Sequence, residues 1–182
     1  MIGIVRPAAA AALLAGALAT APAAAQTVAI SPANSEIGYT VFALGLLPVP
    51  GRFQQFAGTI TWRPSRPHPC LVDILVQVAS LHMDDPDHQR EALSSIMLDA
   101  AGHPTMHFAG ACQGNLVAGR LSMHGVTRPF AVTWHQTAKQ IAGNGALRRT
   151  DYGVNGLPDL ISATVHIRFT IGLPAALQPS TE

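Results

Sequence analysis

Apolar and polar side chains alternate with a period of two along most of the chain. In the longest run, residues 165–171, the apolar positions are separated by His166, Arg168 and Thr170. In an extended strand this period places every second side chain on the same face. Eight segments show the pattern and are predicted to be strands: residues 35–43, 52–62, 70–80, 104–111, 114–124, 127–137, 139–149 and 160–171.

Turn residues interrupt the alternation. Gln113-Gly114-Asn115, Gly125-Val126 and Gly143-Asn144 are typical of turns or bulges, because Gly and Asn tolerate a positive φ. Short connections favour antiparallel neighbours, and eight such strands favour a closed barrel over an open sheet, because closure removes the exposed edges. The chain is therefore predicted to be all-β, an eight-stranded antiparallel barrel.

One segment departs from this pattern. Between residues 84 and 99, Asp85 is a candidate N-cap, Pro86 occupies the first helical position, and Leu93 and Met97 follow at helical spacing. These features predict one short amphipathic helix near one mouth of the barrel. Leu93 and Met97 would face inward, where the helix could act as a lid.

Two cysteines test the predicted pairing of strands. If the strands on either side of the helix are antiparallel neighbours, Cys70 falls opposite Cys112, and Ile74 falls opposite Phe108. A disulfide would join strands whose apolar faces already agree. Two reduced, buried thiols are the alternative that the sequence leaves open.

The first 25 residues have the layout of a cleaved secretory signal peptide. A single cation, Arg6, precedes an apolar stretch over residues 8–19 and the small residues 23–25. The apolar stretch is shorter than the roughly 20 residues of a spanning helix. We expect cleavage before Gln26, one domain over residues 26–182, and an oxidising destination in which thiols tend to pair.

The inward-facing positions of the predicted barrel are almost wholly apolar: Ile37, Tyr39, Val41, Phe53, Ile74, Val76, Leu93, Met97, Met106, Phe108, Leu121, Met123, Phe130, Trp134, Val165 and Phe169. A barrel of this size either is filled by its own side chains or holds one slender ligand. Small residues such as Gly38, Gly119 and Ala163 favour a cavity. We therefore take these sixteen positions as the candidate ligand-binding lumen.

Polar and charged residues restrict the chemistry further. Eleven Lys and Arg against ten Asp and Glu, scattered along the chain, do not predict a nucleic-acid partner. Arg149 and Asp151 are two apart, so both would lie on one face, as an ion pair at the rim or as contacts to a ligand head group. His107, His135 and His166 alternate with inward apolar residues and should face outward. No metal site, cofactor or catalytic residue is predicted, and a ligand cluster formed by other histidines on one rim is the alternative that the sequence leaves open.

Five segments, in order along the chain, carry a family resemblance. They are residues 35–39 (SEIGY), 49–60 (VPGRFQQFAGTI), 98–99 with 103–108 (LD and HPTMHF), 119–129 (GRLSMHGVTRP) and 149–153 (RTDYG). Together they resemble the YceI-like family of lipocalin-like bacterial proteins. The last segment looks like the family's Arg-x-Asp-aromatic-Gly signature. The resemblance covers nearly all of the expected mature chain.

The resemblance implies a lipocalin-like barrel that encloses a long isoprenoid or quinone-like molecule and does not imply an enzyme. We therefore expect a periplasmic protein that carries or sequesters an apolar lipid such as a polyprenyl chain or ubiquinone. The first alternative is a filled barrel that assists an inner-membrane redox or stress-response system through its surface. A homodimer and an inner-membrane redox partner stay open as partners. The second alternative is an enzyme on a lipid, which would need a buried polar group with a partner in the lumen.

Overall fold

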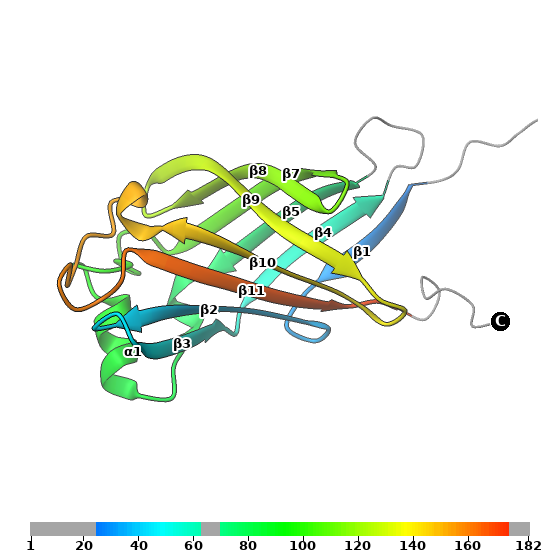
Figure 1. The fold of residues 1–182 in the computed structure, drawn as a ribbon. Coiled ribbons are helices and arrows are strands. Elements are labelled where there is room, and N and C mark those ends of the chain that lie inside the picture. The colour runs from blue at the N-terminus through cyan, green and yellow to red at the C-terminus, as the bar shows by residue number, and fades with distance from the viewer. Residues whose placement is uncertain (1–24, 63–69, 175–182) are drawn as a thin grey trace, which may run out of the picture.

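The computed structural model describes residues 25–62 and 70–174, in which an antiparallel sheet of eleven strands curls into a barrel-like body (Figure 1). The strands are β1 (Gln26–Ile30), β2 (Ser35–Ala43), β3 (Leu47–Phe53), β4 (Phe56–Trp62), β5 (Cys70–Gln77), β6 (Leu81–His82), β7 (Thr105–Gln113), β8 (Leu116–Met123), β9 (Val126–Gln136), β10 (Gln140–Arg148) and β11 (Thr164–Gly172). Their order in the sheet is β1-β4-β5-β7-β8-β9-β10-β11-β2-β3-β6.

The segment from β2 to β4 connects the two ends of the strand order. β2 pairs with β11 and with β3, while β4 pairs with β1 and with β5. Only Gln54 and Gln55 separate β3 from β4, so the end of the strand order is tied back to its beginning. The sheet therefore curls strongly, but it is not the predicted closed barrel, because its end strands β1 and β6 do not pair with each other.

The predicted all-β class is correct, but the predicted number of eight strands is wrong. β2 has the predicted bounds, 35–43, and most other predicted strands are present within a few residues. The predicted strand 52–62 is divided at Gln54–Gln55, where β3 pairs with β2 and β4 pairs with β1. β1 and the two-residue β6 add the remaining strands. Both are too short for an alternation of apolar and polar residues to identify them.

Two of the predicted turns differ from the structure: one lies a residue earlier, and the residues of the other belong to a strand. The β8–β9 turn is formed by His124 and Gly125, with φ values of 52° and 74°, one residue earlier than predicted. Gly143 and Asn144 lie inside β10, paired with both β9 and β11. Gly143 serves close packing: a β-carbon there would overlap the Phe169 ring and the Thr133 carbonyl.

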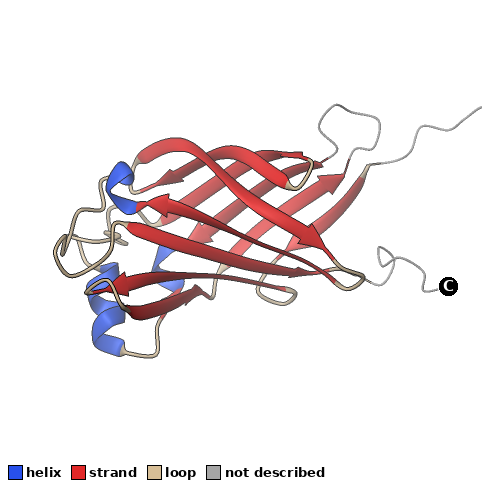
Figure 2. Ribbon diagram, in the orientation of Figure 1, coloured by secondary structure: helices blue, strands red, loops and turns tan. Residues whose placement is uncertain are grey.

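The helical elements gather at one end of the barrel-like body (Figure 2). α1 (Pro86–Leu93) begins as predicted, with Asp85 as its N-cap and Pro86 in its first turn. Two 3₁₀ turns, η1 (Val78–Ser80) and η2 (Arg149–Tyr152), follow β5 and β10. Across residues 25–62 and 70–174, no helix has the length and apolar character needed to cross a membrane.

The core and the disulfide confirm the predicted register of β5 and β7. Ile74 pairs with Phe108 and Val76 with Met106, and Cys70 and Cys112 form a disulfide with Cα atoms 5.1 Å apart. Cys70 begins β5 and pairs with Trp62, which pairs with Gln26 at the start of β1, so the bridge lies at the end of the body where β1 starts, opposite α1 (Figure 1). The expected signal peptide falls outside the described residues, apart from Ala25.

Candidate ligand-binding lumen

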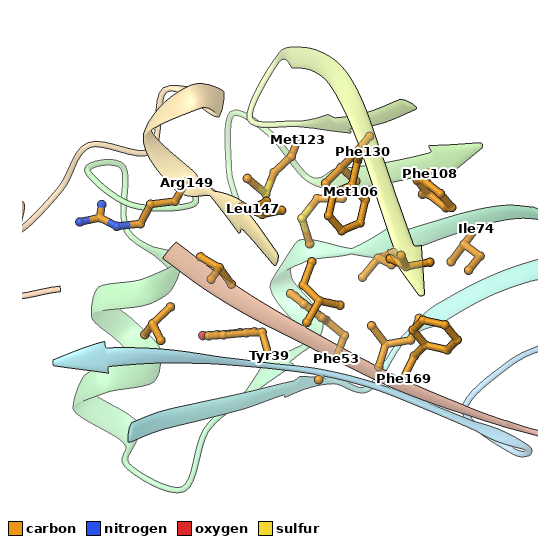
Figure 3. Close-up of a pocket in the computed structure, with 18 of the residues that line it drawn as sticks. Tyr39, Phe53, Ile74, Met106, Phe108, Met123, Phe130, Leu147, Arg149 and Phe169 are labelled. Atoms are coloured by element: carbon orange, nitrogen blue, oxygen red, sulfur yellow. The ribbon is translucent and has the colours of Figure 1, made fainter. Parts of the chain in front are cut away.

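The inner face of the sheet encloses an apolar cavity of about 300 Å³ (Figure 3). Predicted lumen residues that line it are Ile37, Tyr39, Val41, Phe53, Ile74, Val76, Met97, Met106, Phe108, Leu121, Met123, Phe130, Trp134, Val165 and Phe169. An apolar cavity of about 150 Å³ is known to stay dry and to bind benzene, so this one has room for a larger apolar molecule. Contact between these residues and a ligand stays a prediction.

Leu93 is the predicted lumen residue that does not line the cavity. It is half-buried and packs against the core from the C-terminal end of α1. The helix instead presents His88, Glu91 and Ala92 to the cavity, and the segment that follows contributes Met97 and Leu98. α1 therefore covers one end of the lumen, which agrees with the predicted lid position, but it does so with a different face.

Tyr39 is one of the few polar groups in the lumen and lies near α1 (Figure 3). Its hydroxyl donates to the thioether sulfur of Met83 at 3.6 Å, a weak acceptor. The opposing Gly51 leaves space for the ring, since a β-carbon there would lie 2.7 Å from it. Burial raises the pKa of Tyr39 to about 12, so the phenol is neutral at physiological pH and can donate to a ligand oxygen.

Trp134 is the second polar group that the lumen leaves without a strong partner. Its indole nitrogen is buried and has no hydrogen-bond partner among the described residues. The ring packs against Trp62 with centroids 5.6 Å apart, at the end opposite α1. A buried donor without an acceptor is costly, so an acceptor atom on a bound molecule would be favoured there.

Arg149 does not form the predicted ion pair with Asp151. The chain leaves the extended conformation after Arg148 and enters η2, which ends the strand parity on which that prediction rested. Asp151 is exposed, and its backbone carbonyl accepts from Arg128 Nε at 3.1 Å. Arg149 is 3 % exposed and lies on the cavity wall.

The guanidinium of Arg149 is saturated by backbone carbonyls. It donates to the carbonyls of Ser162 at 3.0 Å, Val154 at 2.8 Å, Gly156 at 2.7 Å, Ile161 at 2.8 Å and Leu157 at 3.5 Å. These five bonds use all the N–H donors of an arginine side chain. Desolvation lowers the pKa of Arg149 from its ordinary value, but the carbonyl dipoles surround the charge. Arg149 therefore organises residues 154–162 and has no donor left for a head group.

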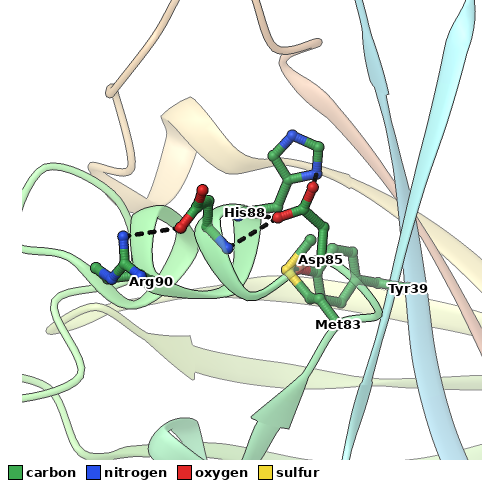
Figure 4. Close-up of polar contacts among 6 residues, drawn as sticks. Tyr39, Met83, Asp85, His88 and Arg90 are labelled. Atoms are coloured by element: carbon green, nitrogen blue, oxygen red, sulfur yellow. Dashed lines mark hydrogen bonds and ion pairs between the residues drawn. The ribbon is translucent and has the colours of Figure 1, made fainter.

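Polar contacts also fix the start of α1 (Figure 4). The Asp85 carboxylate accepts from the backbone N–H groups of Asp87 at 2.8 Å and His88 at 3.2 Å. These bonds lower the pKa of Asp85, because they stabilise its charged form. Arg90 pairs with Asp87 at 3.0 Å on the exposed side. The helix is therefore well formed, although it contains no buried residue.

Exposed leucines surround the α1 end of the lumen. Leu44, Leu46 and Leu47, at the β2–β3 turn, are 64 %, 83 % and 59 % exposed. They belong to a ten-residue stretch, residues 41–50, without a polar or charged side chain. Leu160 joins them, since its carbonyl accepts from the Leu44 N–H at 2.8 Å. The β2–β3 side of this rim is apolar and continuous with the lumen, whereas α1 contributes His88 and Glu91 to the cavity at the same end.

The three histidines for which strand parity predicts an outward position follow that prediction. His135 and His166 are exposed, and His107 lies outside the lumen, where it contacts the Asp73 carboxylate at 3.2 Å. Asp99, His103 and His124, however, come together on the outer side of the α1 end. Strand parity could not identify this group, because it joins the segment after α1 to the β8–β9 turn.

Comparison with known families agrees with this architecture. A family model described as the YceI-like domain matches residues 29–173. A UPF0312 protein of Pseudomonas putida is 26 % identical over 151 residues, which cover 74 % of this chain and 78 % of the relative. A UPF0312 protein of Vibrio cholerae is 24 % identical over 153 residues, covering 74 % and 81 %.

Solved structures show the same fold at low sequence identity. BcnA of Burkholderia cenocepacia superposes with a TM-score of 0.68 and 20 % identity over 80 % of this chain and 99 % of that chain. A polyisoprenoid binding domain from Saccharophagus degradans gives a TM-score of 0.60 and 14 % identity over 81 % and 98 %. These similarities establish the fold and leave the ligand of this chain to be argued from its lumen.

Proposed function

The chain belongs to the YceI-like family, and we propose that it carries or sequesters an apolar isoprenoid-type lipid in its lumen without catalysing a reaction. The observation that carries the proposal is the apolar cavity of about 300 Å³ within the curled sheet. A filled barrel would have bulky side chains meeting at its axis, so the cavity counts against the interaction-module alternative. The structurally similar Saccharophagus domain is described as polyisoprenoid binding, which supports the same ligand class.

The physical chemistry of the lumen suits a long apolar chain with one small polar head. Each methylene that leaves water contributes about 0.8 kcal/mol, so a chain of a few isoprene units binds without polar contacts. The polar side chains on the wall are few, and Tyr39 can donate to the oxygen of a quinone or an alcohol. An enzyme would need a polar group paired with a second one at the reacting atom, and Arg149 is occupied by carbonyls.

The apolar rim gives the lipid a route into the lumen. Val41, Ala43 and Val49 line the cavity, while Leu44, Leu46 and Leu47 in the same hairpin face solvent. A hairpin of this kind can contact a lipid-bearing surface and keep the apolar chain out of water during transfer. The expected signal peptide and the Cys70–Cys112 disulfide support a periplasmic location for the proposed carrier.

The direct test is mass spectrometry of an organic extract of the mature protein, purified from the periplasm without detergent, beside a mock purification. A near-stoichiometric quinone or polyprenyl species is expected. Two substitutions separate lumen binding from surface adsorption. Ile74→Trp places a larger ring in the lumen, whereas Leu75→Trp adds the same ring outside, where Leu75 is 41 % exposed. Occupancy should fall at least about tenfold only in Ile74→Trp, because the larger ring obstructs the path of the chain through the cavity. Empty extracts, with no uptake of added quinone or polyprenol, would refute the proposal.

A further inference from the structure

The outer side of the α1 end holds three side chains of metal-ligating type. Asp99 and His103 come from the segment that follows α1, and His124 comes from the β8–β9 turn. All three side chains are half-buried. One ligand atom from each lies within 4.8 Å of the others, with Nε2 of His103 3.9 Å from Oδ2 of Asp99. We propose that these residues bind a divalent transition-metal ion of the zinc class.

The distances leave a gap that an ion would fill. Ligands bound to zinc at about 2.1 Å in tetrahedral geometry are about 3.4 Å apart. The cluster is slightly wider than this, so small side-chain rotations close it around an ion. The outward pair of His107 and Asp73 behaves differently, because its atoms meet directly at 3.2 Å and leave no space between them. The spacing of Asp99 and His103 suits an intervening ion better than a direct contact.

The imidazole rings of His103 and His124 have no other side-chain partner at hydrogen-bond distance among the described residues. The two rings lie with centroids 4.5 Å apart. Oδ1 of Asp99 accepts from the Gly102 N–H at 3.3 Å, which orients the carboxylate and leaves Oδ2 toward His103. Such a bond to a coordinating carboxylate is typical of metal sites.

Three glycines leave space beside the three ligands. A β-carbon on Gly125 would lie 3.0 Å from Cε1 of His103, and one on Gly153 would lie 3.3 Å from Nδ1 of His124. A β-carbon on Gly102 would overlap the Asp99 carboxylate. Side chains at these positions would crowd the ligands, although the positive φ values of Gly125 and Gly153, 74° and 79°, favour glycine there in any case.

Two histidines and one carboxylate bind zinc, cobalt and nickel, and three protein ligands leave a position for water or another ligand. The ion would join the segment after α1 to the barrel wall. Leu98 and Met123, which precede Asp99 and His124 in the chain, both line the cavity. The ion would therefore hold the segment after α1 against the barrel wall at the α1 end of the lumen.

The test is calorimetric titration of the metal-free mature protein with Zn²⁺, and with Co²⁺ as a spectroscopic probe. One equivalent should bind, and His103→Ala and His124→Ala should each weaken binding at least about tenfold. His135→Ala removes an exposed histidine of β9 and should leave affinity unchanged. If the alanine variants misfold, Co²⁺ should still shift the imidazole resonances of His103 and His124 in the unmodified chain. Failure to bind Zn²⁺, Co²⁺ or Ni²⁺, or equal affinity in all three variants, would overturn the proposal.

Discussion

Arg149 is the residue whose replacement tests the structure most directly. Its five N–H groups hold the backbone carbonyls of Val154, Gly156, Leu157, Ile161 and Ser162 at the α1 end of the lumen. Lysine keeps the charge but offers three donors from a single nitrogen. Arg149→Lys therefore leaves at least two of these carbonyls without a partner.

The magnitude follows from the number of carbonyls that are lost. A buried group without a partner costs about 1–3 kcal/mol, so two such groups cost about 2–6 kcal/mol. Water can reach part of the 154–162 segment, since Leu157 and Ile161 are only half-buried, and this favours the lower part of the range. We expect the free energy of unfolding to fall by about 2–4 kcal/mol, which lowers Tm by roughly 4–16 °C for a domain of this size.

Chemical denaturation of purified Arg149→Lys measures this loss, and Arg148→Lys is the matched control. Arg148 is the exposed last residue of β10, and its replacement should change stability by no more than about 0.5 kcal/mol. Limited proteolysis should cleave residues 154–162 of Arg149→Lys before the rest of the chain. Stability of Arg149→Lys within about 1 kcal/mol of the unmodified protein would show that the carbonyl cage does not hold this segment.

Three further predictions use the lumen and its rim. Burial raises the pKa of Tyr39 from 10 to about 12, so between these pH values the unfolded chain has lost a proton that the folded chain keeps. The free energy of unfolding should therefore fall as pH rises through this window, by at most about 1.4 kcal/mol per pH unit. Tyr39→Phe should reduce that slope. Phenolate absorbance can follow the titration, because the chain has two tyrosines, and ordinary titration near pH 10 would contradict it. Trp134→Phe removes a buried donor without a partner and should stabilise the ligand-free protein. The same substitution should weaken the binding of a ligand that bonds to the indole by about 2- to 13-fold, measured by equilibrium dialysis. Equal affinity would exclude such a bond. The double variant Leu46→Ser, Leu47→Ser should slow lipid uptake from vesicles without lowering the final occupancy. As a control, Leu71 is 37 % exposed beside Cys70, and Leu71→Ser should leave the uptake rate unchanged. Equal rates in the two variants would show that the leucines of the rim take no part in transfer.

The strands and the disulfide could be predicted because strand parity has only two solutions. If Val76 faces inward, Leu75 faces outward, and the pairing of β5 with β7 then places Cys70 beside Cys112. The start of α1 could also be predicted from the sequence, since Asp85 and Pro86 act through local geometry. Local rules therefore placed the lumen wall.

The rest depended on contacts between segments far apart in the sequence. The bend at Gln54–Gln55 exists because β3 and β4 take different partners, which alternation within one strand does not reveal. Arg149 was assigned to a strand face, but the chain turns into η2 at that residue. Asp99 and His124 meet only after the barrel-like body forms, so their spacing in the sequence carries no sign of the cluster.

The two ends of the lumen differ in how easily they can open. The end opposite α1 is held by the Cys70–Cys112 disulfide and by neighbouring strand pairs, so opening it would break covalent or ladder bonds. The other end is covered by α1, whose eight residues include none that is buried, and by the segment that Arg149 holds. Within α1, Leu93 is the residue that packs against the core, so displacing the helix sacrifices little apolar contact and local opening at this end is the less costly motion. The exposed leucines Leu44, Leu46 and Leu47 lie at this same end, which supports loading of the proposed carrier past α1.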